Sequence, residues 1–251
     1  MVATLARNEF LEDIWDYRPG ESIGLFGNTG SGKTWFAYQL AQQSLRQNPG
    51  MRFTSFQPKP SDETTDGYVD SLGLKVSDSY PFRKRFWEND PYGWVHWPRH
   101  ITTDTDADIE HITKAFKKSL SGEYWHGNVL SFVDDEFLLA SKYGCANELE
   151  QYLIAGRSNR AGLMFALQAP KGTMRTGVSS FHFSQPTHML WNRENVQANR
   201  DKYAEVACGI DPVLIESLVG NLRTYRVKDG LISESLYIDR RGPYACIVSP
   251  F

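Results

Sequence analysis

Short apolar runs and segments with helical periodicity alternate along the first three quarters of this chain. Runs that are typical of buried strands lie at residues 22–26, 52–56, 128–133, 163–167 and 187–191. Between them, apolar side chains recur every three or four positions, as in amphipathic helices, at residues 33–45 and 106–120, and a further helix is expected at about 147–156. This alternation predicts an α/β fold, a mostly parallel sheet flanked by helices.

The end of the chain has a different pattern. Residues 224–227 and a run from Leu231 to Ile238 flank the turn Lys228-Asp229-Gly230, which predicts a C-terminal β-hairpin. The chain has 251 residues, 41% of them hydrophobic, and no repeat or Ser/Gly linker divides it. We therefore expect a single domain over residues 1–251. Its core should span about 20–192, with C-terminal helices and the hairpin at about 193–251.

Composition and charge exclude several classes of protein. A formal net charge of −3 does not fit a protein coated in positive charge for nucleic acid. The 3 cysteines lie far apart, which excludes a disulfide framework or zinc knuckle and favours buried free thiols. The N-terminal stretch is charged and no apolar window is long enough for a membrane segment, so we expect a soluble, intracellular protein.

A glycine-rich loop follows the first predicted strand and precedes the first predicted helix. It has the Walker A sequence Gly27-Asn28-Thr29-Gly30-Ser31-Gly32-Lys33-Thr34. Glycines let consecutive backbone N–H groups face a phosphate, and the helix N-terminus adds positive potential. We expect Lys33 to contact the β- and γ-phosphates and the Thr34 hydroxyl to bind Mg²⁺. This motif predicts a nucleotide site.

Three consecutive acids follow the strand at 128–133. Asp135 is assigned to the metal and Glu136 to the attacking water, as a general base. A shift of the register by one residue would make Asp134 the metal residue instead. An adjacent glutamate and the absence of an Asn-Lys-x-Asp guanine-reading sequence favour ATP over GTP.

Two further elements complete the candidate site. Gln168 ends the strand at 163–167, where a polar side chain can sense the γ-phosphate. Arg157 lies eleven residues earlier and could stabilise transition-state charge on a neighbouring subunit's ATP, with Arg160 as its rival.

The order and spacing of these motifs resemble the FtsK/HerA superfamily of DNA-pumping P-loop ATPases, whose fold is of the ASCE/RecA-like kind. The resemblance runs from about Ser22 to Leu190. It implies ATP and Mg²⁺ as cofactors, and it implies a trans-acting role for Arg157. Ala169 stands where an arginine often follows the glutamine, and no membrane segment or winged-helix tail is present. The chain is therefore most similar to viral genome-packaging ATPases.

The resemblance also implies partners. It predicts a ring homo-oligomer, a pentamer or hexamer, around double-stranded DNA, with Lys171 and Arg175 tracking phosphates. A capsid portal or vertex would be a further partner, and the protein would lie in the host cytoplasm and transiently at the capsid. The alternatives are a DNA translocase or coupling ATPase of a plasmid or mobile element, and a P-loop assembly or regulatory ATPase without a DNA track.

Overall fold

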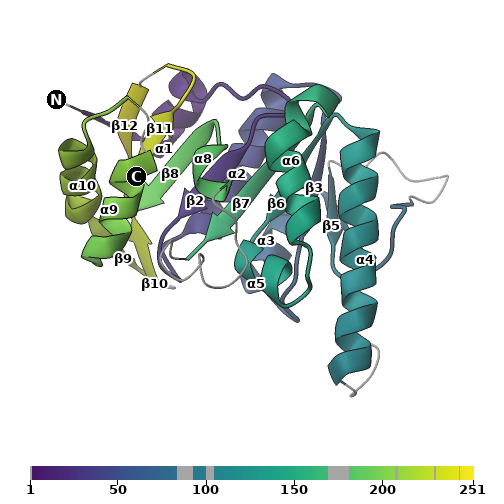
Figure 1. Ribbon diagram of the computed structural model, residues 1–251. Helices are drawn as coiled ribbons and strands as arrows, with labels where there is room; N and C mark the ends of the chain where they lie inside the picture. Colours follow the sequence, from purple (N-terminus) through teal and green to yellow (C-terminus); the bar gives the residue numbers. More distant parts are fainter. Residues whose placement is uncertain are drawn as a thin grey trace.

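The apolar runs form the centre of one extended sheet in a computed structural model of the chain (Figure 1). The structure describes residues 2–83, 93–99, 105–168, 181–206, 209–228, 230–242 and 244–251. Helices cover both faces of the sheet, as the sequence predicted. None of the described helices is long and apolar enough to cross a membrane.

The elements of the described residues have the following bounds. The strands are β1 (Ala3–Ala6), β2 (Ile23–Phe26), β3 (Arg52–Phe56), β4 (Leu74–Ser77), β5 (Gly93–His96), β6 (Val129–Val133), β7 (Ala161–Leu167), β8 (His188–Asn192), β9 (Thr224–Val227), β10 (Gly230–Ser233), β11 (Ser235–Asp239) and β12 (Tyr244–Ser249). The helices are α1 (Arg7–Glu9), the π-helix η1 (Phe10–Ile14), α2 (Lys33–Gln47), α3 (Glu63–Ser71), α4 (Thr105–His126), α5 (Glu136–Ser141), α6 (Ala146–Asn159), α8 (Phe181–Ser184), α9 (Gln197–Val206) and α10 (Pro212–Asn221).

The order of the strands determines which loops meet. In the part of the chain that the structure describes, one 10-stranded sheet has the order β1-β12-β11-β8-β2-β7-β6-β3-β5-β4. Each of its pairings is parallel except those of β11 with β8 and with β12, so β11 alone runs against the others. Strand β7 lies between β2 and β6. The loops after β2, β6 and β7 therefore lie at one edge of the sheet.

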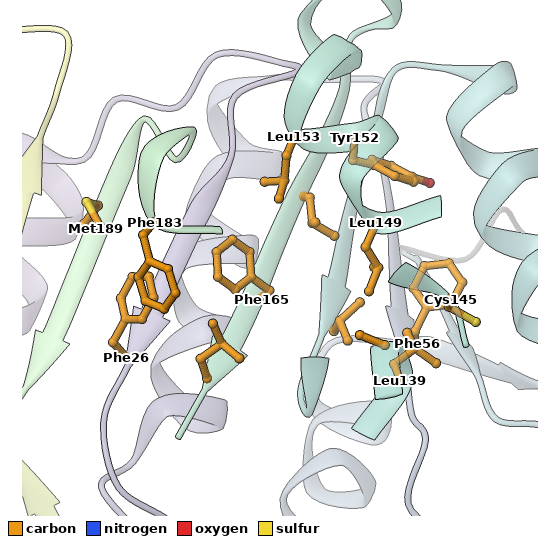
Figure 2. Close-up of a cluster of buried hydrophobic side chains, with 14 of the residues drawn as sticks. Phe26, Phe56, Leu139, Cys145, Leu149, Tyr152, Leu153, Phe165, Phe183 and Met189 are labelled. Atoms are coloured by element: carbon orange, nitrogen blue, oxygen red, sulfur yellow. The ribbon is translucent and has the colours of Figure 1, made fainter. Parts of the chain in front are cut away.

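Two hydrophobic clusters cover the two faces of this sheet. Along β7, Leu163 and Phe165 belong to the cluster under α4 and α6, whereas Met164 and Ala166 belong to the cluster under α2. This alternation is the period of two that a strand imposes on its side chains. Figure 2 shows the first cluster, in which Phe165 lies between helix α6 and the ring of Phe183. Burial on both faces explains why the central strands are continuous apolar runs.

The structure also differs from the sequence prediction in three places. The predicted second arm of the hairpin is two strands, because β10 pairs with β9 while β11 joins the main sheet. Residues after 56 contain α3 and β4, and the chain begins with the strand β1; the sequence pattern predicted none of these three elements. Cys145 and Cys246 are buried free thiols, as expected, and Cys208 lies outside the described residues.

Candidate functional site

The glycine-rich loop connects β2 to α2 and brings backbone N–H groups to one point. Gly32 is the N-cap of α2 with a φ of 88°, and Gly30 has a φ of 78°, both in the left-handed region that favours glycine. The first N–H groups of a helix have no intrahelical acceptors, and the helix dipole adds positive potential there. The N-terminus of the 15-residue helix α2 is therefore suited to bind a phosphate group.

Lys33 is folded back onto this loop. Its ammonium donates hydrogen bonds to the carbonyl of Gly27 at 2.7 Å and to that of Asn28 at 2.8 Å. Lys33 is only 9% exposed. Burial lowers the pKa of Lys33 to about 8, a net value that includes an opposing effect of Asp134 and a smaller lowering by the positive charge of Lys59. A second negative group, such as a phosphate, would stabilise the charged lysine.

Asp134 is the acid that lies against Thr34. The Thr34 hydroxyl donates to Asp134 Oδ1 at 2.5 Å, and Asp134 Oδ2 lies 2.6 Å from the ammonium of Lys59. The hydroxyl and carboxylate oxygens are the donors that Mg²⁺ prefers, so these residues fit the ion that the sequence implies. The structure therefore places Asp134, and not Asp135, beside Thr34, because β6 ends at Val133 and the next side chain faces the loop.

The other two acids of the run point elsewhere. Asp135 Oδ1 accepts a hydrogen bond from the backbone N–H of Leu138 and caps α5. Burial raises the pKa of Asp135, although this N–H and nearby lysines oppose the shift. Glu136 is 0% exposed, and its Oε1 lies 2.8 Å from Nε2 of His182 on α8. The two atoms are close, but neither makes a hydrogen bond of good geometry.

A cavity of about 650 Å³ lies between the glycine-rich loop and Asp134, and this size suits a nucleotide. Its centre is lined by the glycine-rich loop with Lys33 and Thr34. One side carries Asp134, Lys59 and the exposed Gln168 at the end of β7. The other side is lined by residues of the β9–β10 hairpin, which lies at the same end of the sheet (Figure 1): Val227, Lys228, Leu231 and Ile232.

The sequence did not predict that Lys59 and residues of the C-terminal hairpin line the cavity. Lys59 follows β3, which pairs with β6 and so ends beside Asp134. A lysine between two prolines after a predicted strand was the available signal, but the pairing of β3 with β6 could not be read from the sequence. The contribution of the hairpin depends in the same way on a contact between distant parts of the chain.

Arg157 and Arg160 lie at the opposite end of the central strands, where β7 begins. Arg157 donates a hydrogen bond to Thr187 Oγ1 at 2.9 Å, just before β8, and Arg160 is the exposed C-cap of α6. The 7-residue strand β7 separates both arginines from Gln168, a length of roughly 20 Å. Neither arginine can reach the glycine-rich loop of the same chain. Lys171 and Arg175 lie outside the described residues.

The fold and this arrangement define a P-loop NTPase fold of the ASCE/RecA-like kind. The strand order β8-β2-β7-β6-β3 puts the strand that ends in Gln168 between the strand of the glycine-rich loop and that of the acids. No family model matches the chain, and no curated protein matches it.

Solved structures do match. The genome packaging NTPase B204 from Sulfolobus turreted icosahedral virus 2, in complex with sulfate, is 14% identical with a TM-score of 0.60, over 94% of this chain and 98% of that chain. The same NTPase in complex with AMPPCP gives 14% identity and a TM-score of 0.58 over 94% of this chain and 100% of that chain. The DNA-packaging ATPase B204 from Sulfolobus turreted icosahedral virus is 14% identical with a TM-score of 0.58, over 94% of this chain and 100% of that chain. The expected likeness to viral packaging ATPases is confirmed at the level of the fold.

Proposed function

We propose that this chain is an ATP-hydrolysing subunit of an oligomeric motor that moves double-stranded DNA into a viral capsid. The observation that carries the proposal is the single cavity in which Lys33, Thr34, Asp134 and Gln168 converge. It occurs in a fold shared, over 94% of the chain, with a genome packaging NTPase. This NTPase was solved with AMPPCP, a nucleotide analogue, which supports ATP as the ligand of this chain.

In this proposal the nucleotide replaces contacts that the site makes with itself. The Lys33 ammonium leaves the carbonyls of Gly27 and Asn28 and binds the β- and γ-phosphates. Thr34 and Asp134 would hold Mg²⁺, and this ion would supply positive charge that offsets the charge of the phosphates. Lys59 then exchanges Asp134 for the γ-phosphate, and Gln168 orients the attacking water from the end of β7.

The base that activates this water is one of two neighbouring carboxylates. Asp135 is only half-buried and lies directly beside Asp134. Glu136, the residue assigned from the sequence, is fully buried against His182 and could reach the water only if that contact opened. Asp135 is the more accessible of the two, so in this proposal it is the general base, and its carboxylate would have to leave the N–H of Leu138 to reach the water. In this assignment Asp134 is the metal residue, and each role moves one residue toward the N-terminus.

The position of Arg157 supports a ring. An arginine at the opposite end of β7, roughly 20 Å from Gln168, can act as a finger only on another subunit's nucleotide. A head-to-tail ring, a pentamer or hexamer, would bring the edge that carries Arg157 and Arg160 to the cavity of the next subunit. Basic residues such as Lys171 and Arg175, repeated around the ring, would contact DNA phosphates without reading the sequence. A capsid portal or vertex would receive the DNA.

The test is ATP turnover with and without DNA. At low salt, duplex DNA is expected to stimulate turnover more than single-stranded DNA of the same sequence does, and the stimulation should fall as salt rises. Lys33→Ala is the inactive control. Robust turnover without any stimulation by duplex DNA at low salt would instead favour an assembly or regulatory ATPase. Displacement of a third strand from a triplex would then show movement along the duplex.

A further inference from the structure

The cavity has an apolar wall for which phosphate chemistry gives no role. This wall consists of Val227, Leu231 and Ile232 on the β9–β10 hairpin. Leu231 is 54% exposed, although it lines the same cavity as the charged side chains of Lys33 and Asp134. An exposed apolar side chain beside a phosphate loop is well placed to contact the uncharged part of a nucleotide.

The hairpin is fixed against the loop. A Cβ atom built on Gly32 would lie 3.4 Å from Ile232 Cγ2, which is ordinary contact distance, so Ile232 packs directly over Gly32. The N–H of Ser233 donates to the carbonyl of Ser31 at 3.3 Å. A two-stranded sheet is marginally stable alone, and these contacts hold it over the phosphate loop. The apolar wall therefore has a fixed position relative to the phosphates.

The base of the hairpin is held by buried polar groups. Glu234 is 5% exposed and accepts hydrogen bonds from the N–H of Arg223 at 2.7 Å and from the Tyr225 hydroxyl at 2.9 Å. The amide of Asn192, at the end of β8, donates to Ser235 Oγ at 3.1 Å. The base of the hairpin is thus connected to β8, which pairs with β2, the strand before the glycine-rich loop.

The direction of a bound nucleotide follows from the charged groups. Thr34 and Asp134 would hold the Mg²⁺ that offsets the charge of the terminal phosphates, so the γ-phosphate end would lie on the side of Asp134 and Lys59. The rest of the nucleotide has to extend away from that end. On the basis of the proposed ATP site, we propose that the β9–β10 hairpin binds the base and ribose, with Leu231 and Val227 against the face of the base.

Trp35 is the other large apolar side chain of the cavity, and its surroundings argue against stacking on the base. The Arg7 guanidinium lies 4.4 Å from the centre of the Trp35 ring, and the Trp35 carbonyl accepts a hydrogen bond from Tyr68 of α3. Trp35 therefore belongs to the N-terminal and α3 side of the cavity, away from the hairpin.

Two ligands separate base binding from phosphate binding: ATP and inorganic tripolyphosphate, each titrated with Mg²⁺ by calorimetry. Leu231→Ala is expected to weaken ATP binding about tenfold, because it removes most of one apolar side chain from the base. The same variant should bind tripolyphosphate as the wild type does. Leu231 is exposed, so the substitution should leave thermal unfolding unchanged, and Val76→Ala on β4, at 51% exposure, is the matched control.

The outcomes are distinct. Unchanged ATP affinity in Leu231→Ala and in the double variant with Val227→Ala would overturn the inference, as would an equal loss for both ligands. Equal affinities of the wild type for ATP and tripolyphosphate would also overturn it, yet leave the phosphate site intact. A wild type that bound neither ligand would refute the proposed nucleotide site itself, and the hairpin's role with it. In Lys33→Ala, loss of both ligands is expected, since Lys33 acts on the phosphates.

Discussion

The nucleotide-free protein should become more stable when Lys33 is replaced by methionine. Lys33 is buried and charged, and burial lowers its pKa from 10.5 to about 8. At 1.36 kcal/mol per pKa unit, this difference is a destabilisation of ~3 kcal/mol at neutral pH. Methionine keeps the apolar stem but loses the hydrogen bonds to Gly27 and Asn28, each with a net value of ~1 kcal/mol. We expect a net gain of ~1–3 kcal/mol, or roughly 2–10 °C in Tm.

The dependence on pH distinguishes this cause from simple repacking. Below pH 8 the lysine is charged in both the folded and unfolded protein, so the destabilisation of the wild type is fully present. Between pH 8 and 10.5 the unfolded chain binds more protons than the folded one, so the wild type gains stability as pH rises. The advantage of Lys33→Met should therefore shrink across this window and vanish above it.

Thermal unfolding followed by circular dichroism, in EDTA and without nucleotide, measures both effects. Lys118→Met, at an exposed position on α4, is the control and should change Tm little at any pH. Calorimetry should show that Lys33→Met no longer binds ATP. A variant less stable than the wild type at pH 7, or a difference that does not vary with pH, would refute the reasoning about the buried charge.

Three other predictions concern hydrolysis. Asp135→Asn should retain ATP binding, and its rate of ATP turnover should fall by ~10²–10⁴-fold. Glu136→Gln should keep its turnover rate and have a lower Tm, because the substitution disturbs the buried pair with His182; the opposite pattern in single-turnover assays would restore Glu136 as the base. Lys59→Ala should lower kcat by about tenfold with ADP affinity unchanged, because Lys59 lies on the γ-phosphate side; weaker ADP binding would contradict this. The ATP turnover rate of Arg157→Ala should fall ~10³-fold, and part of it should return when this variant is mixed with Asp135→Asn, whose subunits supply the arginine. A mixture that stays inactive, together with a loss of turnover in Arg160→Ala, would favour Arg160 as the finger.

The sequence predicted those parts of the site that are contiguous in the chain. The glycine-rich loop, its strand and its helix lie within residues 22–47, so local rules of apolar periodicity and helix termination sufficed. The end of β7 at Gln168 could be located in the same way, because a fully buried strand is a continuous apolar run. Pairings between strands, in contrast, put Lys59 and the hairpin into the cavity, and local patterns do not determine them.

The roles of the three acids could not be assigned correctly from the sequence, for a related reason. Asp134, Asp135 and Glu136 follow β6 directly, and each is chemically able to take either role. What separates them is the direction of each side chain where the strand becomes a helix. Asp134 faces Thr34, Asp135 caps α5 and Glu136 turns inward to His182. A shift of one residue changes the face, and composition alone contains no information about it.

The contact of Glu136 with His182 also gives the site a mechanical connection. Glu136 lies two positions after Asp134, and His182 belongs to α8, the first described element after Gln168 along the chain. Both side chains are buried, and their charged or polar ends lie 2.8 Å apart, so the surrounding core encloses Glu136 and His182 together. Phe183, the next residue, stacks on Phe26 at 5.5 Å, directly before the glycine-rich loop. A displacement of Asp134 or of the loop on nucleotide binding would therefore move α8, the first described element after Gln168.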